Sequence, residues 1–119
     1  MKKILILGAS NNPSRYANLA ANRLVAKGYP IINVGIKSGE VAGMPIELAD
    51  VIHPDIDTIT LYLNSQKQTQ YYDYIIKSKP RRIIFNPGTE NPELEALAEE
   101  NGIETIEACT LVMLSTGQF

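Results

Sequence analysis

The stretch that decides the fold is Gly8-Ala9-Ser10-Asn11-Asn12-Pro13-Ser14-Arg15-Tyr16. It follows the apolar run Ile4-Leu5-Ile6-Leu7 and precedes residues with helical spacing. A buried strand, a turn that begins with glycine and a helix start, in that order, are typical of a phosphate site in an α/β sheet. The pattern therefore predicts that this stretch holds a phosphate group of a nucleotide. The simpler alternative is that it is only a turn.

Individual residues of the stretch suit this role. Ala9 and Ser10 are small enough for a ligand to approach the backbone. We expect Asn12 to cap the following helix and Pro13 to occupy its first position, where a missing N–H costs nothing. Arg15 comes one turn later, so its guanidinium can bind phosphate oxygens in a bidentate manner.

Length and composition limit the class of protein. A chain of 119 residues predicts one domain, spanning positions 1–119, with a real hydrophobic core. Apolar residues make up 45% and charged residues 20%, as in an ordinary globular protein. The net charge of −2 leaves no basic stripe, which argues against a nucleic-acid partner. The apolar runs are too short to span a membrane and no signal peptide is evident, so we expect a cytoplasmic protein.

Strand and helix patterns alternate along the chain, which predicts an α/β fold of three layers. Its mostly parallel sheet would have five to six strands, with helices on both faces. The expected strands are Lys3–Leu7, Ile31–Val34, Met44–Ile46, Thr58–Leu63, Arg82–Phe85 and Glu104–Ile106. The expected helices are Pro13–Lys27, a single turn at Leu48–Ile52, a helix capped by Ser65 that runs to Ser78, and one from Pro92 that closes at Gly102. Right-handed crossovers and the glycine loop predict the strand order 3-2-1-4-5-6, with Lys3–Leu7 in the centre.

The loop after the second expected strand begins Gly35-Ile36-Lys37. A protein that binds NAD normally has Asp or Glu at this point, which bonds the ribose 2′-hydroxyl. A cation in place of the acid favours a ribose that carries an extra phosphate. The alternative is that Lys37 is a solvated loop residue.

The chain resembles the small stand-alone coenzyme A-binding proteins, which have a Rossmann-like fold. The likeness spans nearly the whole chain and rests on Gly8-Ala9-Ser10-x-x-Pro13-x-Arg15-Tyr16, Gly28-Tyr29, Gly43-Met44-Pro45-Ile46, Ile56-Asp57-Thr58, Gly88 with Asn91, and Gly102-Ile103. A more distant likeness, to the CoA-binding domain of the succinyl-CoA ligase alpha subunit, rests on Gly35-Ile36-Lys37-Ser38-Gly39 followed by Gly43-Met44-Pro45-Ile46. The resemblance implies that the cofactor is coenzyme A or an acyl-CoA, whose ribose carries a 3′-phosphate.

The candidate cofactor-binding residues are Gly8, Ala9, Ser10, Asn11, Asn12, Pro13, Ser14, Arg15, Tyr16, Gly35, Lys37, Leu63, Asn86, Pro87 and Gly88. Residues that carry out catalysis are not evident. The single histidine, His53, precedes a proline in a turn, and the single cysteine, Cys109, reads as a small buried residue. One cysteine cannot form an internal disulfide, and one cysteine with one histidine is too few for a zinc site of the usual Cys and His ligands.

Three functions stay open on these grounds. The first is a module that binds coenzyme A or an acyl-CoA without catalysis of its own. The second is an NAD(P)-binding redox sensor or minimal oxidoreductase, for which Lys37 favours the phosphorylated nucleotide. The third is a protein-interaction module with a vestigial nucleotide site, whose apolar patch would be the segment Ala108–Leu114. That segment fits either a helix or a strand.

Overall fold

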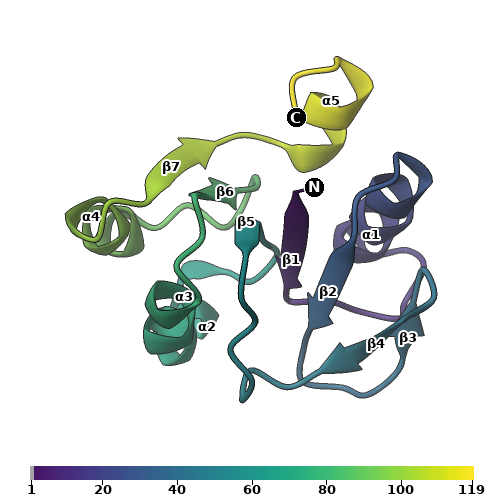
Figure 1. The fold of residues 1–119 in the computed structure, drawn as a ribbon, viewed down its shortest axis with the longest axis horizontal. Helices are drawn as coiled ribbons and strands as arrows, with labels where there is room; N and C mark the ends of the chain where they lie inside the picture. Colours follow the sequence, from purple (N-terminus) through teal and green to yellow (C-terminus); the bar gives the residue numbers. More distant parts are fainter. Residues whose placement is uncertain (1) are drawn as a thin grey trace.

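A seven-stranded sheet forms the middle layer of the fold (Figure 1), which a computed structural model describes for residues 2–119. The strand order is β3-β4-β2-β1-β5-β6-β7. All neighbouring strands run parallel except β3 and β4, which form an antiparallel hairpin. The strands are β1 (Lys3–Leu7), β2 (Ile31–Val34), β3 (Glu40–Val41), β4 (Met44–Glu47), β5 (Ile56–Leu61), β6 (Arg82–Phe85) and β7 (Glu104–Glu107).

The central position of β1 follows from its sequence. Residues Ile4 to Leu7 are fully buried, as expected of a strand that is covered on both faces in a parallel sheet. The predicted order of six strands is confirmed, and Met44–Ile46 belongs to a strand parallel to β2. The predicted strand count is one short, because β3 is too brief to produce a periodic pattern and lies between Gly39 and Gly43.

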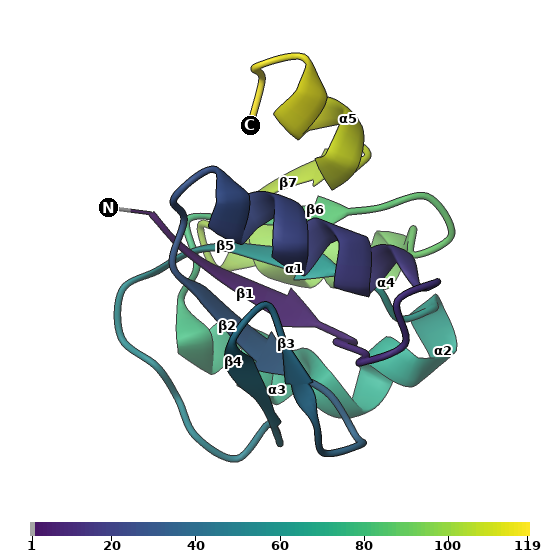
Figure 2. The ribbon, with the colours of Figure 1, turned by 90° about the vertical axis from the view of Figure 1, so that its right-hand side faces the viewer.

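Helices cover both faces of the sheet (Figure 2), which confirms the predicted three-layer, Rossmann-like class. Helix α1 (Tyr16–Ala26) lies on one face beside α5 (Thr110–Ser115). The other face carries α2 (Ser65–Gln68), the 3₁₀ turn η1 (Thr69–Tyr71), α3 (Tyr72–Ser78) and α4 (Pro92–Glu100). Within residues 2–119 no helix is both long and apolar enough to cross a bilayer.

Alternate side chains of β1 enter different halves of the core. Ile4 and Ile6 pack with α1, whose small Ala17 and Ala21 allow it to sit close to the sheet. Leu5 and Leu7 point the other way and pack with residues of α3 and α4. Side chains on the two faces of β1 therefore pack against the two helix layers, one on each side of the sheet.

The start of α1 differs from the prediction. The helix begins at Tyr16 with Arg15 as its N-cap residue, so the expectation of an Asn12 cap and a helical Pro13 was wrong. Asn12 Oδ1 instead accepts hydrogen bonds from Ser14 N (3.0 Å) and Ser14 Oγ (2.8 Å). This local turn competes with the helix for the same asparagine oxygen. The loop after β1 is consequently longer than predicted, and it extends to Arg15.

Two other predicted elements are also corrected. The segment Leu48–Ile52 forms turns and not a helix. The predicted helix over 65–78 is interrupted by η1, and its cap is not Ser65 but Asn64, whose side chain accepts from Lys67 N at 3.0 Å. Strand β5 begins and ends earlier than the predicted Thr58–Leu63, which leaves Leu63 in the following loop.

At the C-terminal end the undecided segment Ala108–Leu114 contributes most of helix α5. Thr110, Met113 and Leu114 are buried, whereas Val112 is exposed. Two apolar side chains of this segment, Met113 and Leu114, therefore belong to the core. The predicted cap of α4 is confirmed, since Asn91 Oδ1 accepts from Leu94 N at 3.2 Å.

Candidate functional site

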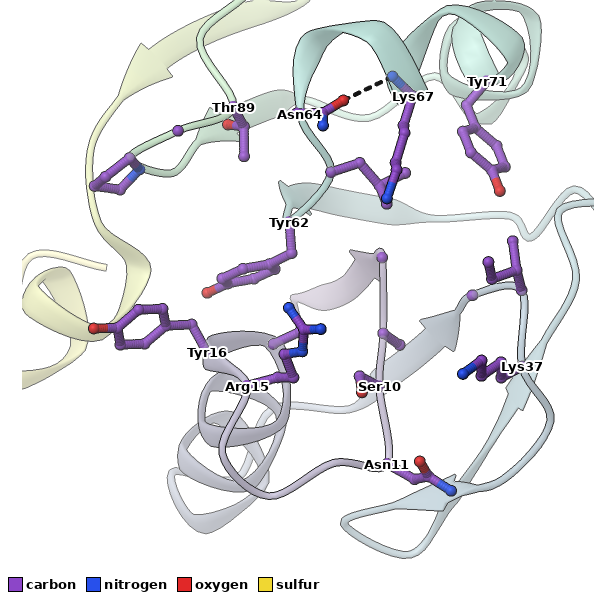
Figure 3. A pocket seen from close by; sticks show the side chains of 18 residues that line it. Ser10, Asn11, Arg15, Tyr16, Lys37, Tyr62, Asn64, Lys67, Tyr71 and Thr89 are labelled. Atoms are coloured by element: carbon purple, nitrogen blue, oxygen red, sulfur yellow. Dashed lines mark hydrogen bonds between the residues drawn. The ribbon is translucent and has the colours of Figure 1, made fainter.

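A pocket of about 400 Å³ opens where β2, β1, β5 and β6 end (Figure 3). These are neighbouring parallel strands, so their carboxyl ends meet at one edge of the sheet, where open α/β folds bind ligands. The residues that line the pocket are Gly8, Ala9, Ser10, Asn11, Arg15, Tyr16, Ala17, Gly35, Ile36, Lys37, Tyr62, Leu63, Asn64, Lys67, Tyr71, Pro87, Gly88 and Thr89.

Most of the predicted site residues meet in this pocket. They are Gly8, Ala9, Ser10, Asn11, Arg15, Tyr16, Gly35, Lys37, Leu63, Pro87 and Gly88. The structure places Asn12, Pro13, Ser14 and Asn86 outside the lining. Asn12 and Ser14 are bonded to each other within the loop, where they set its shape.

Asn86 lies behind the pocket wall and has a structural environment. Its Nδ2 donates to Thr60 Oγ1 (2.7 Å) and to Leu61 O (2.8 Å), and its Oδ1 accepts from Thr110 N (2.9 Å). The side chain is buried. These contacts join the ends of β5 and β6 to the start of α5.

The loop after β1 is held against β2 by its first two residues. The N–H groups of Gly8 and Ala9 both donate to Val34 O at 2.9 Å, so neither is free for a ligand. A Cβ atom on Gly35 would lie 2.6 Å from Ala9 O, a distance that Cβ atoms do not reach in proteins. The close approach of the two loops therefore requires glycine at position 35.

Backbone donors further along this loop remain available. Within the described part of the chain, the N–H groups of Ser10, Asn11, Tyr16 and Ala17 make no hydrogen bond. The last two belong to the first turn of α1, where backbone N–H groups have no helical partner. The positive end of the helix dipole lies at the same point, so an anion placed there is stabilised.

Three cationic side chains from different elements surround the pocket: Arg15 before α1, Lys37 after β2 and Lys67 on α2. Figure 3 shows that Arg15 and Lys67 reach into the space from opposite sides and that Lys37 approaches from a third. Among residues 2–119 none of the three pairs with an acid, and the lining includes no carboxylate. The pocket therefore suits a ligand with several negative charges.

An aromatic part of the wall comes from residues that sequence analysis did not select as ligand contacts. Tyr62 follows β5 and Tyr71 belongs to η1. Burial raises the pKa of the Tyr62 phenol, although the neighbouring Thr60 and Thr110 oppose the shift. In the described residues the buried Tyr62 hydroxyl has no hydrogen-bond partner. Tyr62 is thus a neutral ring at the β5 side of the pocket.

The residues missed by sequence analysis are Ala17, Ile36, Tyr62, Asn64, Lys67, Tyr71 and Thr89. Tyr62 directly follows the parallel strand β5 and Asn64 comes two residues later, positions that by themselves could have marked both residues. Lys67 carries no such signal, because the rotation of a short helix decides where its side chain points.

The reactive side chains of the sequence lie elsewhere. His53 contacts Glu47 at the end of β4, and Cys109 is half-buried before α5; neither lines the pocket. In the part of the chain that the structure describes, no three His, Cys, Asp or Glu side chains come together as metal ligands.

Comparisons with known proteins agree with this geometry. A family model described as "CoA binding domain" matches residues 2–115. A crystal structure of a protein described only as uncharacterized is 55% identical, with a TM-score of 0.97, and the match covers 100% of this chain and 98% of that one. A hypothetical protein from Pyrococcus horikoshii OT3 is 27% identical, with a TM-score of 0.87, over 97% of this chain and 82% of that one.

A larger enzyme shares the fold. The dinucleotide forming acetyl-coenzyme A synthetase 1 of Ca. Korarchaeum cryptofilum, in complex with phosphate and ADP, has a TM-score of 0.71 and 20% identity. The match covers 90% of this chain but 25% of that one, so it concerns one part of the enzyme. Among curated proteins none matches this chain significantly.

Proposed function

The chain belongs to the family of CoA binding domains, and we propose that its pocket binds coenzyme A or an acyl-CoA. The observation that carries the proposal is the convergence of Arg15, Lys37 and Lys67 on a pocket whose lining, among residues 2–119, includes no acid. Coenzyme A carries a diphosphate and a ribose 3′-phosphate, which together need more than one cation. Charge-assisted hydrogen bonds from arginine and lysine are the usual partners of such groups.

The topology suggests how coenzyme A lies in the pocket. In open α/β sheets the diphosphate sits at the loop after the first strand and the nucleoside lies toward the second strand. The diphosphate would then meet Ser10, Asn11 and Arg15, and the ribose 3′-phosphate would meet Lys37. The pantetheine arm is left to follow the ends of β5 and β6, past Leu63 and Gly88.

We propose that the protein binds this ligand without catalysing a reaction. The lining residues among positions 2–119 include no histidine, cysteine or carboxylate, the groups that most often act as base or nucleophile. The competing function is an NADP-binding module, which the position of Lys37 also favours, since NADP has a ribose 2′-phosphate.

A thermal-shift series separates the two functions. The protein is heated with CoA, acetyl-CoA, NAD, NADP or ATP at equal concentrations. A ligand that binds only the native state raises Tm, and at a fixed ligand concentration the rise grows with the logarithm of its affinity. We expect CoA or acetyl-CoA to give the largest rise. A larger rise with NADP than with either CoA compound, or no rise with any of the five, would contradict the proposal.

A further inference from the structure

A fully buried glutamine joins two loops of the pocket wall. Gln68, at the end of α2, has an exposed fraction of 0%. Its Nε2 donates to Leu63 O at 2.8 Å and to Thr89 O at 2.7 Å. Leu63 follows β5 and Thr89 follows β6, and both line the pocket. One amide group thus spans the two loops that form the wall on this side.

The orientation of that amide is fixed by a second one. Gln68 Oε1 accepts from Asn91 Nδ2 at 2.8 Å, which requires the Gln68 nitrogen to face the two carbonyls. Asn91 Nδ2 also donates to the Tyr72 hydroxyl at 2.8 Å, and that hydroxyl donates to Glu93 Oε1 at 2.9 Å. Asn91 Oδ1 caps α4 through Leu94 N. Every polar atom of the Gln68 side chain is therefore bonded.

Regular strand pairing does not hold these loops together. The β5–β6 ladder ends at the pair Leu61 and Phe85, before Leu63 and Thr89 are reached. Beyond that pair, Asn86 Nδ2 still bonds to Leu61 O, and the Gln68 amide then links the next parts of the two segments, at Leu63 and Thr89. Its loss would leave two backbone carbonyls without their partner in a buried place, which favours separation of the loops.

We infer that Gln68, held by Asn91, is a positioning residue that sets the wall along which the pantetheine arm lies. The inference rests on the proposed function, in which that arm follows the ends of β5 and β6. Pantetheine is an uncharged amide chain, so it gains affinity from a preformed surface and not from the cations of the pocket. Gln68 therefore determines how much tighter CoA binds than its adenosine phosphate part alone.

The test compares two ligands by titration calorimetry. They are CoA and adenosine 3′,5′-bisphosphate, which keeps the adenosine, the 3′-phosphate and the inner 5′-phosphate of CoA but lacks the outer 5′-phosphate and the pantetheine arm. In Gln68→Leu we expect the CoA affinity to fall about 10-fold, which corresponds to the loss of one or two ordinary hydrogen bonds. We expect the affinity for the bisphosphate to fall less than about 2-fold. A purely structural role would change both affinities by the same factor.

Asn33 offers a matched control. It has an exposed fraction of 1%, and its Nδ2 donates to two backbone carbonyls, of Val41 (3.1 Å) and Met44 (3.2 Å). These belong to the β3–β4 hairpin, at the opposite edge of the sheet from β5 and β6. In Asn33→Leu we expect the ratio of the two affinities to stay as in the unmodified protein.

The titrations distinguish a failure of the proposed function from a failure of the inference about Gln68. If the unmodified protein binds neither CoA nor the bisphosphate, the proposed function is wrong. If it binds CoA but Gln68→Leu leaves the ratio unchanged, the inference about Gln68 is wrong. Should Gln68→Leu not fold, Asn91→Asp serves instead, because it keeps the cap on Leu94 N but removes the donor to Gln68 Oε1. It should shift the ratio in the same direction, and an unchanged ratio would overturn the inference.

Discussion

Arg15 stands at the junction between the loop after β1 and helix α1. It is the N-cap residue, yet its side chain makes no capping hydrogen bond and points into the pocket (Figure 3). Within residues 2–119 it forms no ion pair. The guanidinium is thus available to a ligand, while the fold does not depend on it.

Replacing Arg15 by alanine should therefore weaken CoA binding and leave stability unchanged. We expect a loss of roughly 1.5–3 kcal/mol in binding free energy, the range for hydrogen bonds to charged groups. Titration calorimetry measures it. Arg23→Ala is the control, because Arg23 is an exposed residue in the last turn of the same helix and does not line the pocket. Equal dissociation constants for Arg15→Ala and the unmodified protein would remove Arg15 from the site.

Lys37 should determine the preference for a phosphorylated ribose. We expect the unmodified protein to bind CoA more tightly than 3′-dephospho-CoA, and Lys37→Ala to lose most of that difference. Lys37 is exposed, so water and salt screen the contact, and the preference should shrink as ionic strength rises. Equal affinities for the two compounds in the unmodified protein would show that Lys37 is a solvated loop residue.

Whether a single lining residue could be predicted from the sequence depended on its position relative to the strands and helices. Arg15 lies beside the start of the helix that follows β1, and Lys37 comes three residues after β2; the fold rule locates ligands at both places. Lys67 lies on a helix whose rotation the sequence does not specify. Asn86 is a polar residue directly after a strand, as a ligand contact would be, but its amide bonds to Thr60 and Leu61 instead. These partners are distant in the sequence, so the sequence does not reveal the contact.

Elements with a continuous apolar pattern were the most predictable. Strand β1 was found because burial on both faces leaves no polar alternation. The start of α1 was not, because an asparagine before a proline can either cap a helix or close a turn, and here Asn12 does the second. The break in the predicted helix over 65–78 could not be predicted, because this stretch contains no proline or glycine.

The contact between the loops after β1 and β2 leads to a prediction about Gly35. A Cβ there would lie 2.6 Å from Ala9 O, so Gly35→Ala must displace backbone. We expect a loss of about 1–3 kcal/mol in the free energy of unfolding, as for other overpacked sites, together with weaker CoA binding. Urea denaturation and calorimetry measure the two effects.

Gly102→Ala is the control for Gly35→Ala. Its φ of +73° makes alanine strained, but a Cβ there meets nothing within 4 Å and the residue is not part of the pocket. It should lower stability by about 1–2 kcal/mol and leave CoA affinity unchanged. A Gly35→Ala protein as stable as the original, with normal affinity, would contradict the close packing of the two loops.

For the molecule as a whole, the two ends of the sheet have different tasks. The cationic pocket lies at the carboxyl ends of the strands. At the amino ends, an ion pair joins Asp57 of β5 to Arg81, the residue before β6. Arg81 Nε lies 2.9 Å from Asp57 Oδ1. Burial raises the pKa of Asp57, but hydrogen bonds from Arg81 and Thr58 and the charge of Arg81 outweigh burial, so the pKa lies below its ordinary value of 3.8.

This shift makes a prediction about acid stability. Because Asp57 has a lower pKa in the folded than in the unfolded protein, its contribution is complete above pH 3.8 and is lost as the pH falls through the folded value. Asp57→Asn should destabilise the protein at pH 7 by about 1 kcal/mol or less, since Arg81 is half exposed and the pair is screened. The difference from the unmodified protein should shrink below pH 3.8.

Urea denaturation at several pH values measures this difference. Asp73→Asn is the control, because Asp73 and its partner Lys77 are largely exposed and such pairs contribute little. A difference between Asp57→Asn and the unmodified protein that stays constant from pH 7 into the acid range would show that the charge of Asp57 is not the cause.

Binding of CoA in the pocket at the carboxyl ends of the strands can be located by a titration that is followed by amide NMR signals. With CoA added, we predict the largest chemical-shift changes at residues 8–17, at Lys37, at residues 63–67 and at Gly88 and Thr89. Changes concentrated instead around Asp57 and Arg81, where a second hollow lies at the opposite end of the sheet, would contradict the account, as would a spectrum that CoA leaves unchanged.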